Sequence, residues 1–168
     1  NAGCYVFRRE IIESIPAGVP VSVERDVFPH LLETDCRMYG HVDSHYWRDM
    51  ATPQDFMQIS ADLVQGIAPS PALEGHQGDY LVLPGADVAE TASLQQGTVV
   101  GQGAVVGHND VVTSSVLFDG AVLGDDVVIE RSLIGNGAHI GNVCVVRDAV
   151  IGDDAIIGDR CELLDGIR

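Results

Sequence analysis

The segment that decides the fold runs from Leu83 to the end of the chain and repeats itself in rows of equal length. Its five rows read LPGADVAETASLQQGTV (83–99), VGQGAVVGHNDVVTSSV (100–116), LFDGAVLGDDVVIERSL (117–133), IGNGAHIGNVCVVRDAV (134–150) and IGDDAIIGDRCELLDGI (151–167). Within a row, aliphatic residues recur at steps of about six, six and five, which fits neither the period of a strand nor that of a helix alone. The pattern predicts a solenoid of three short strands per coil, with turns between the strands.

Two other zones precede the repeat. Residues 1–64 read as mixed α/β, with strands predicted at 1–7 and 37–42, a short helix at 10–15 and a second helix capped by Ser22. The stretch 65–80 is rich in Pro, Gly and polar residues and reads as a linker. Residues 81–168 form the predicted β-helix.

The sequence around Thr52 carries the strongest local signal in the first zone. Thr52 can cap a helix, Pro53 suits its first position and Asp55 places an acid in its first turn. Phe56, Ile59 and Leu63 would share one face, and Gly66 would close the helix. The sequence therefore predicts a helix from Pro53 to about Gly66.

Charge and composition restrict the class of partner. The net charge is −16, and all nine cationic residues are arginine. Such an acidic chain favours neither nucleic acid nor an anionic membrane as a partner. It has no apolar run of membrane-spanning length and no signal-like segment, so we expect a cytoplasmic protein. In that reducing compartment, Cys144 and Cys161, which occupy one column of adjacent coils, are expected to be free thiols.

Three stretches together carry a resemblance to a known family. NAGCYVF (1–7), SVERDVFP (22–29) and YWRDMATPQDF (46–56) resemble the second half of a sugar-nucleotidyltransferase. The Pro-rich link into hexapeptide repeats is similar to the bacterial mannose-1-phosphate guanylyltransferase branch. The resemblance implies a fold of class α/β + β, with the tail of a Rossmann-like nucleotidyltransferase domain followed by a left-handed parallel β-helix of about five coils.

The resemblance also implies an activity and its residues. Members of the family join a sugar 1-phosphate to a nucleoside triphosphate with Mg²⁺ and release pyrophosphate. The family's W-x-D-x-G-T-P segment maps onto Trp47, Asp49, Thr52 and Pro53, which makes Asp49 the expected catalytic metal ligand. The family's N-A-G strand maps onto Asn1 and Gly3, the expected sugar contacts. The implied reaction makes GDP-mannose from GTP and mannose 1-phosphate.

The chain departs from the family pattern in three places. It has no G-G-x-G-T-R-L loop for the triphosphate, no first magnesium aspartate and no lysine for the sugar phosphate. Ala51 also stands where the family usually has Gly. We therefore expect a further segment upstream of Asn1 in the active enzyme, and no activity from this chain alone.

Three other functions remain open. Thymidylyl, uridylyl or adenylyl transfer to glucose 1-phosphate is the nearest of them. Another is a non-catalytic assembly or regulatory module, because a stacked solenoid has exposed edges and flat aliphatic faces that favour a homo-oligomer. The last is a hexapeptide acyltransferase with His108 or His139 as general base. The uninterrupted register of the rows and the different coil positions of these histidines disfavour it.

Overall fold

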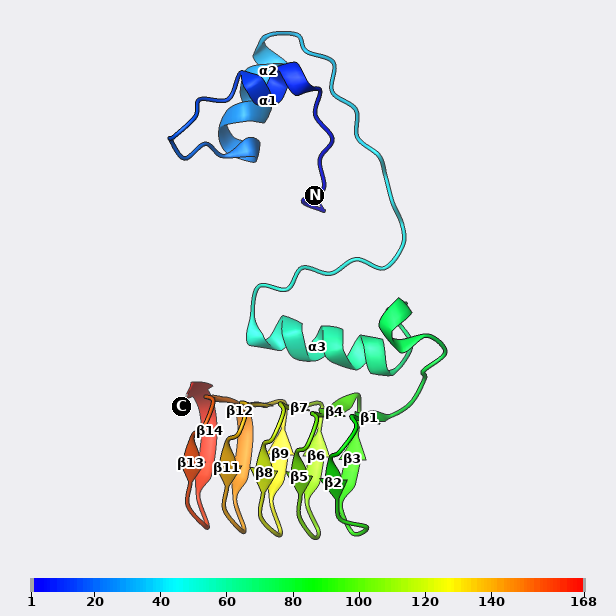
Figure 1. The fold of residues 1–168 in the computed structure, drawn as a ribbon, viewed down its shortest axis with the longest axis vertical. Helices are drawn as coiled ribbons and strands as arrows, with labels where there is room; N and C mark the ends of the chain where they lie inside the picture. Colours follow the sequence, from blue (N-terminus) through cyan, green and yellow to red (C-terminus); the bar gives the residue numbers. More distant parts are fainter. Residues whose placement is uncertain (1, 168) are drawn as a thin grey trace. The chain divides into compact units, whose positions relative to one another are not determined.

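The computed structural model describes residues 2–167, and these fall into two compact units, Asn1–Trp47 and Arg48–Arg168 (Figure 1). The unit boundary lies earlier than the residue 64 at which we expected the first zone to end. The reason is that helix α3 (Pro53–Val64) packs on the β-helix and so belongs to the second unit. Each unit is described below by itself.

The first unit contains short helices joined by extended chain. They are α1 (Arg9–Glu13), the π-helical turn η1 (Val23–Val27) and α2 (Phe28–Glu33). Ser22 accepts a hydrogen bond from the Arg25 backbone N–H at 3.2 Å, so the predicted cap is confirmed. Val27 and Leu31 are the buried apolar residues of this unit.

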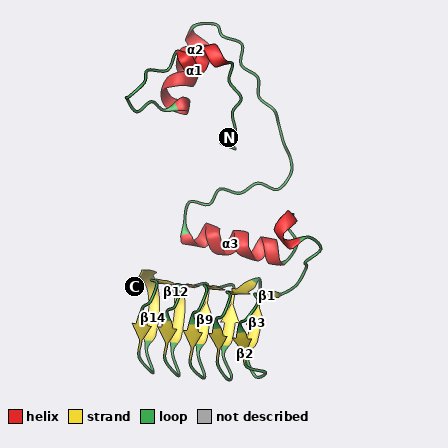
Figure 2. Ribbon diagram, viewed as in Figure 1, coloured by secondary structure: helices red, strands yellow, loops and turns green. Residues whose placement is uncertain are grey.

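The strands predicted at 1–7 and 37–42 are not found among residues 2–47 (Figure 2). Tyr5 and Phe7 do alternate as predicted, because both rings pack against Phe28 while Val6 is 99% exposed. A strand also needs a hydrogen-bonded neighbour, and within residues 2–47 no strand pairing is found for either segment. The predicted alternation of buried and exposed side chains at Tyr5, Val6 and Phe7 was therefore correct. The prediction of a strand was wrong.

The second unit is a parallel β-helix, as the repeat predicted (Figure 2). Its strands are β1 (Tyr80–Val82), β2 (Asp87–Val88), β3 (Ser93–Gln95), β4 (Thr98–Val100), β5 (Val105–Val106), β6 (Val111–Thr113), β7 (Val116–Leu117), β8 (Val122–Leu123), β9 (Val128–Glu130), β10 (Leu133–Ile134), β11 (His139–Ile140), β12 (Val145–Ile151), β13 (Ile156–Ile157) and β14 (Glu162–Ile167). All the pairings are parallel and join equivalent strands of successive coils.

The coils enclose a three-sided prism. The first face stacks β1, β4, β7, β10 and the end of β12; the second stacks β2, β5, β8, β11 and β13; the third stacks β3, β6, β9 and the start of β12 and of β14. Aliphatic columns fill the interior, and Val100, Leu117, Ile134 and Ile151 form one of them at 0–1% exposure. Burying each such side chain contributes roughly 1.5–3 kcal/mol.

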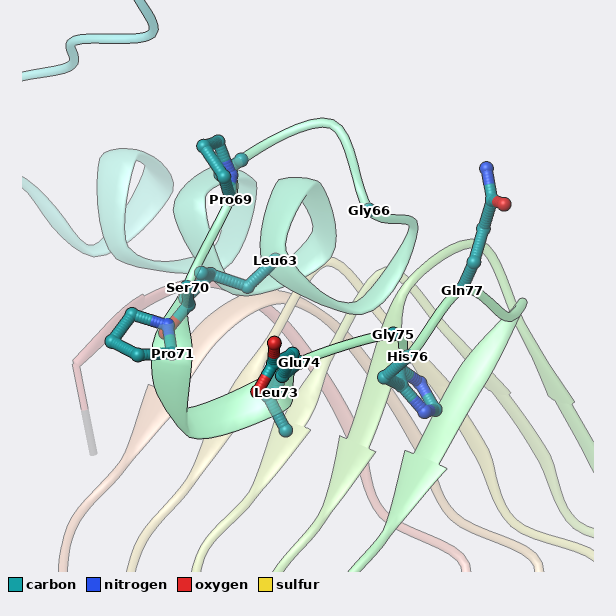
Figure 3. A pocket seen from close by; sticks show the side chains of 11 residues that line it. Leu63, Gly66, Pro69, Ser70, Pro71, Leu73, Glu74, Gly75, His76 and Gln77 are labelled. Atoms are coloured by element: carbon teal, nitrogen blue, oxygen red, sulfur yellow. The ribbon is translucent and has the colours of Figure 1, made fainter.

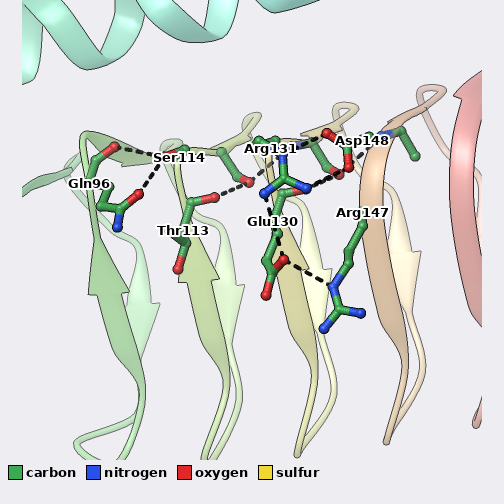
Figure 4. Close-up of polar contacts among 10 residues, drawn as sticks. Gln96, Thr113, Ser114, Glu130, Arg131, Arg147 and Asp148 are labelled. Atoms are coloured by element: carbon green, nitrogen blue, oxygen red, sulfur yellow. Dashed lines mark hydrogen bonds and ion pairs between the residues drawn. The ribbon is translucent and has the colours of Figure 1, made fainter.

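Polar side chains join the coils at the corner between the third and first faces (Figure 4). Arg131 donates two hydrogen bonds of 2.6 Å to Asp148 in the following coil, and these bonds lower the pKa of Asp148. Arg147 donates to Glu130 in the preceding coil at 3.0 Å. These charged side chains therefore bind one coil to the next through hydrogen bonds.

The register of the first coil differs from the prediction. Val82 pairs with Val100 and Gln95 with Thr113, whereas Val99 pairs with Val116 in the register of the later coils. The partners in the first two pairs lie one position further apart in the chain than those in the third. The extra residue lies at the corner between β3 and β4, where Gln96 and Gly97 both have positive φ. The repeat therefore keeps a constant length only from β4 onward.

Candidate active-site segment

Asp49 lies in an irregular stretch, residues 48–52, which we call the Asp49 segment. It leads directly into α3, and the side chain of Asp49 is exposed. The segment has no helix or strand of its own, so the contacts at its two ends decide where the carboxylate lies.

The carboxyl end of the segment is held by a capping box. Thr52 accepts the Asp55 backbone N–H at 3.1 Å, and the Thr52 backbone N–H donates to the Asp55 carboxylate at 3.0 Å. Hydrogen bonds from Thr52 also lower the pKa of Asp55. Pro53 at the first helical position completes the predicted helix start, which is confirmed.

The amino end of the segment is held by an ion pair. The Arg48 guanidinium lies 3.6 Å from the carboxylate of Asp62, which is 4% exposed on α3. Gln58 donates a hydrogen bond to Asp62 at 2.8 Å. This ion pair was not predicted from the sequence. The available signal was Asp62, an acid that stands next to Leu63 of the predicted apolar face.

Helix α3 rests on the first face of the β-helix (Figure 1). Its buried side carries Ala61 and Val64, whereas the predicted face of Phe56, Ile59 and Leu63 is only half-buried. The helix approaches the first coil closely, and this favours a small residue such as Ala61 at the contact. The Asp49 segment is thus connected to the solenoid through α3.

The described residues match only part of a Mg²⁺ site. No three His, Cys, Asp or Glu side chains within residues 2–167 come together as a set that could hold a metal ion. Asp49 offers one exposed carboxylate. Mg²⁺ is commonly held by one or two carboxylates together with substrate phosphates and water. Asp49 therefore fits as one ligand of such a site.

The predicted sugar contacts belong to the first unit. Asn1 lies outside the described residues. Gly3 has φ +68° and open space within 4 Å of where a Cβ would stand. That backbone conformation suits glycine. Gly3 lies in the first unit and Asp49 in the second, and each is described within its own unit.

The two candidate acyltransferase histidines are exposed and separate. His108 follows β5 at a corner, where its Nδ1 lies 3.3 Å from Thr91 Oγ1 in the preceding coil. His139 lies on β11, on the outer side of the second face. The described residues of the β-helix extrude no loop beside either histidine.

A hollow of about 550 Å³ lies at the carboxyl end of α3, away from Asp49 (Figure 3). Leu63 and most residues of the segment 66–77 line it, and Asp49 does not. His76 is one of the lining residues, and its Nε2 is buried without a hydrogen-bond partner in the described chain. Within the second unit, the predicted residues Asp49, His108 and His139 do not line this hollow.

Within residues 2–167, no helix is long and apolar enough to cross a membrane. The longest helix described, α3, has 12 residues. A spanning helix needs about 20 apolar residues.

Comparison with known proteins identifies the relatives of the chain. It is 59% identical over 120 residues to a mannose-1-phosphate guanylyltransferase from Mycobacterium tuberculosis, an alignment that covers 71% of this chain and 33% of that protein. It is 28% identical over 127 residues to a glucose-1-phosphate adenylyltransferase from Bacillus licheniformis, covering 70% of this chain and 33% of that protein. The chain thus spans about a third of the length of these curated relatives and resembles their carboxyl-terminal part.

Among solved structures, a mutant perosamine N-acetyltransferase from Caulobacter crescentus in complex with CoA and GDP-perosamine is similar at a TM-score of 0.40. The two are 19% identical, and the match covers 53% of this chain and 49% of that one. The parallel β-helix is established by the strand pairings of the chain itself, and a likeness at this score adds nothing to it.

A family model describes the solenoid itself. The model, described as the EIF2B subunit epsilon LbH domain, matches residues 80–167, which are more than half of the chain. The matched range begins at β1 and ends with β14, so it coincides with the β-helix. The chain therefore belongs to this family of left-handed β-helix domains.

Proposed function

We propose that the protein containing this chain is a sugar-1-phosphate nucleotidyltransferase that makes GDP-mannose and pyrophosphate from GTP and mannose 1-phosphate. The observation that carries the proposal is the 59% identity to a mannose-1-phosphate guanylyltransferase. The identity extends over 120 residues, which is longer than the β-helix of residues 80–167 alone.

The reaction exchanges one phosphorus–oxygen bond for another. A phosphate oxygen of the sugar 1-phosphate attacks the α-phosphorus of the nucleoside triphosphate, and the bond to the leaving pyrophosphate breaks. Catalysis then depends on positioning the two substrates and on neutralising their charge. A chain of net charge −16 makes that neutralisation demanding.

In this proposal Asp49 is a metal ligand, and Asn1 and Gly3 contact the sugar. When bound, Mg²⁺ supplies positive charge at the phosphates of both substrates. Asp49 is exposed and has anchored residues on both sides, Arg48 before it and Thr52 after it. Gly3 adopts a backbone conformation in which a Cβ would be strained, so its backbone is open to close approach by a ligand.

Pyrophosphate release by the intact protein tests this function. We expect release that depends on GTP, mannose 1-phosphate and Mg²⁺, and we expect Asp49→Asn to lower it by about a hundredfold. Asp87→Asn is the matched control, since it removes the same charge from an exposed aspartate on β2. Full turnover by Asp49→Asn would refute the role of Asp49, and an inactive wild type would refute the function.

One observation favours an alternative pair of substrates, a different nucleotide with glucose 1-phosphate. It is the similarity to a glucose-1-phosphate adenylyltransferase. The same assay, run with ATP, UTP or dTTP and glucose 1-phosphate, separates this alternative. Preference for one of these pairs over GTP and mannose 1-phosphate would replace the first proposal.

We also propose that the β-helix assembles the protein into a homo-oligomer. This role would hold for the intact enzyme and equally for a non-catalytic assembly module. The outer column of the second face runs through Asp87, Val105, Val122, His139 and Ile156, so three of its five members are apolar, and Ile156 is 82% exposed. Exposed apolar side chains on a flat face favour contact with another protein surface. Light scattering on the purified protein should give a mass above that of one chain, and a monomer would contradict the proposal.

A further inference from the structure

Two departures of the β-helix from its own repeat lie against α3. One is the extra residue at Gln96–Gly97. The other is Phe118, which stands at a position where Gly101, Gly135 and Gly152 occur in three other coils. In the first coil the same position holds Leu83. A departure from a largely regular repeat points to a local requirement at that position.

The first departure brings the solenoid backbone against the helix. Gly97 has φ +77°, and a Cβ built on it would lie 2.4 Å from Cβ of Ala61. The Gly97 and Gln96 N–H groups donate to the backbone carbonyl and side chain of Asp79, at 2.7 and 3.1 Å. The lengthened first coil thus forms a corner that only glycine fits beneath α3.

The second departure places an aromatic ring under the same helix. The Phe118 ring stacks on that of Phe56 with centroids 5.7 Å apart and planes 29° apart. Phe56 lies in the first turn of α3 and Ala61 in its second half, so the two departures contact the helix at separate points. Two contacts fix the direction of a helix, which one contact cannot do.

We propose that Gly97 and Phe118 are positioning residues, which dock α3 on the β-helix and thereby hold the Asp49 segment in place for nucleotidyl transfer. The proposal rests on the function proposed above. It gives the solenoid a role in the reaction through the helix that it carries.

The connection from α3 to Asp49 is short and is held at both ends. The capping box fixes Thr52 to the first turn of the helix, and the Arg48–Asp62 ion pair fixes the other end of the segment to the same helix. A shift of about 1 Å at a reacting group can lower a rate roughly a hundredfold. Release of α3 would therefore misplace Asp49 without altering its carboxylate.

The docking is tested by hydrogen exchange in the intact protein. Phe118→Gly installs the residue that three other coils have at this position, so the β-helix should persist while α3 loosens. Gly97→Ala adds a Cβ against Ala61. Gly103→Ala is the matched control, because Gly103 has φ +66° and no atom within 4 Å of its Cβ position. We expect amide exchange in residues 56–64 to become about tenfold faster in the first two variants and not in the control. Unchanged exchange in both would overturn the docking role.

Pyrophosphate release separates positioning from stability. Phe118→Gly should lower kcat about tenfold and raise the Mg²⁺ concentration for half-maximal rate, with the KM for the nucleotide less affected. Phe118→Tyr, which keeps a ring to stack on Phe56, should restore both values. A loosened helix with unchanged kcat would overturn the positioning role and leave the proposed function standing. A wild type without turnover would instead refute the function, and hydrogen exchange would still decide the docking.

Discussion

The carboxylate of Asp110 accepts the backbone N–H of Val127, one coil later, at 2.7 Å. It also accepts the N–H of Gly107 at 2.8 Å. Asp110 is fully buried, and this burial raises its pKa to about 6, against an ordinary value of 3.8. Between these two values the folded protein binds more protons than the unfolded chain, so the contribution of Asp110 to stability falls as pH rises.

Replacing Asp110 should therefore change how stability depends on pH. As the pH falls from about 7 to about 4.5, the unfolding free energy of the wild type should rise by about 2 kcal/mol relative to that of Asp110→Asn. Urea unfolding at a series of pH values measures this difference. Asp87→Asn, an exposed aspartate of β2, is the control and should give a much smaller change. Parallel pH profiles for the wild type and Asp110→Asn would contradict the prediction.

Val143 adopts a backbone conformation that a β-branched residue rarely takes. Its φ is +59°, the same as that of Asn109, which occupies this corner two coils earlier. An L-residue in this region costs roughly 1–2 kcal/mol, and asparagine tolerates it better than valine. Val143→Asn should therefore raise the unfolding free energy by about 1 kcal/mol, seen as a higher melting temperature.

A second variant separates the backbone effect from the loss of an exposed apolar side chain. Val143→Ala removes the branched side chain, which is 53% exposed, but keeps a Cβ at positive φ. It should gain less stability than Val143→Asn. An equal gain in both variants would show that side-chain exposure, and not φ, causes the effect.

The repeat and the helix start could be predicted because both are local patterns. The capping box needs only Thr52, Pro53 and Asp55, which are neighbours in the chain. The three-strand coil follows from the spacing of aliphatic residues and turn residues within one row. The position of Asp49 just before a helix follows from the same local signal.

The extra residue of the first coil could not be read from the rows. Val82 and Leu83 are both aliphatic, so an alignment of Val82 with Val100 looks as good as one of Leu83 with Val100. Only the hydrogen-bonded register distinguishes them. Two other contacts could not be predicted either, because they depend on tertiary packing. They are the Arg48–Asp62 ion pair and the close approach of Ala61 to Gly97.

The cap at Thr52 should control the order of the first turn of α3. Thr52→Ala removes the oxygen that accepts the Asp55 N–H and should cost about 1 kcal/mol of local stability. Faster exchange at residues 55–57 measures this loss, and Thr52→Ser should keep most of the protection. Exchange that is unchanged in Thr52→Ala would mean that packing alone orders this turn.

Cys144 and Cys161 share a column of the β-helix, yet both are free thiols. Cys144 is fully buried, its thiol donates to the Gly158 carbonyl at 3.1 Å, and its sulfur accepts the Cys161 N–H at 3.4 Å. A thiol reagent should therefore label exposed Cys4 readily and reach Cys144 only when the coils open. Mass spectrometry after timed labelling, with Cys4→Ser as the control, measures both rates. If Cys144 reacted as fast as Cys4, the last two coils would be opening locally, and their stacking hydrogen bonds would contribute little to holding them closed.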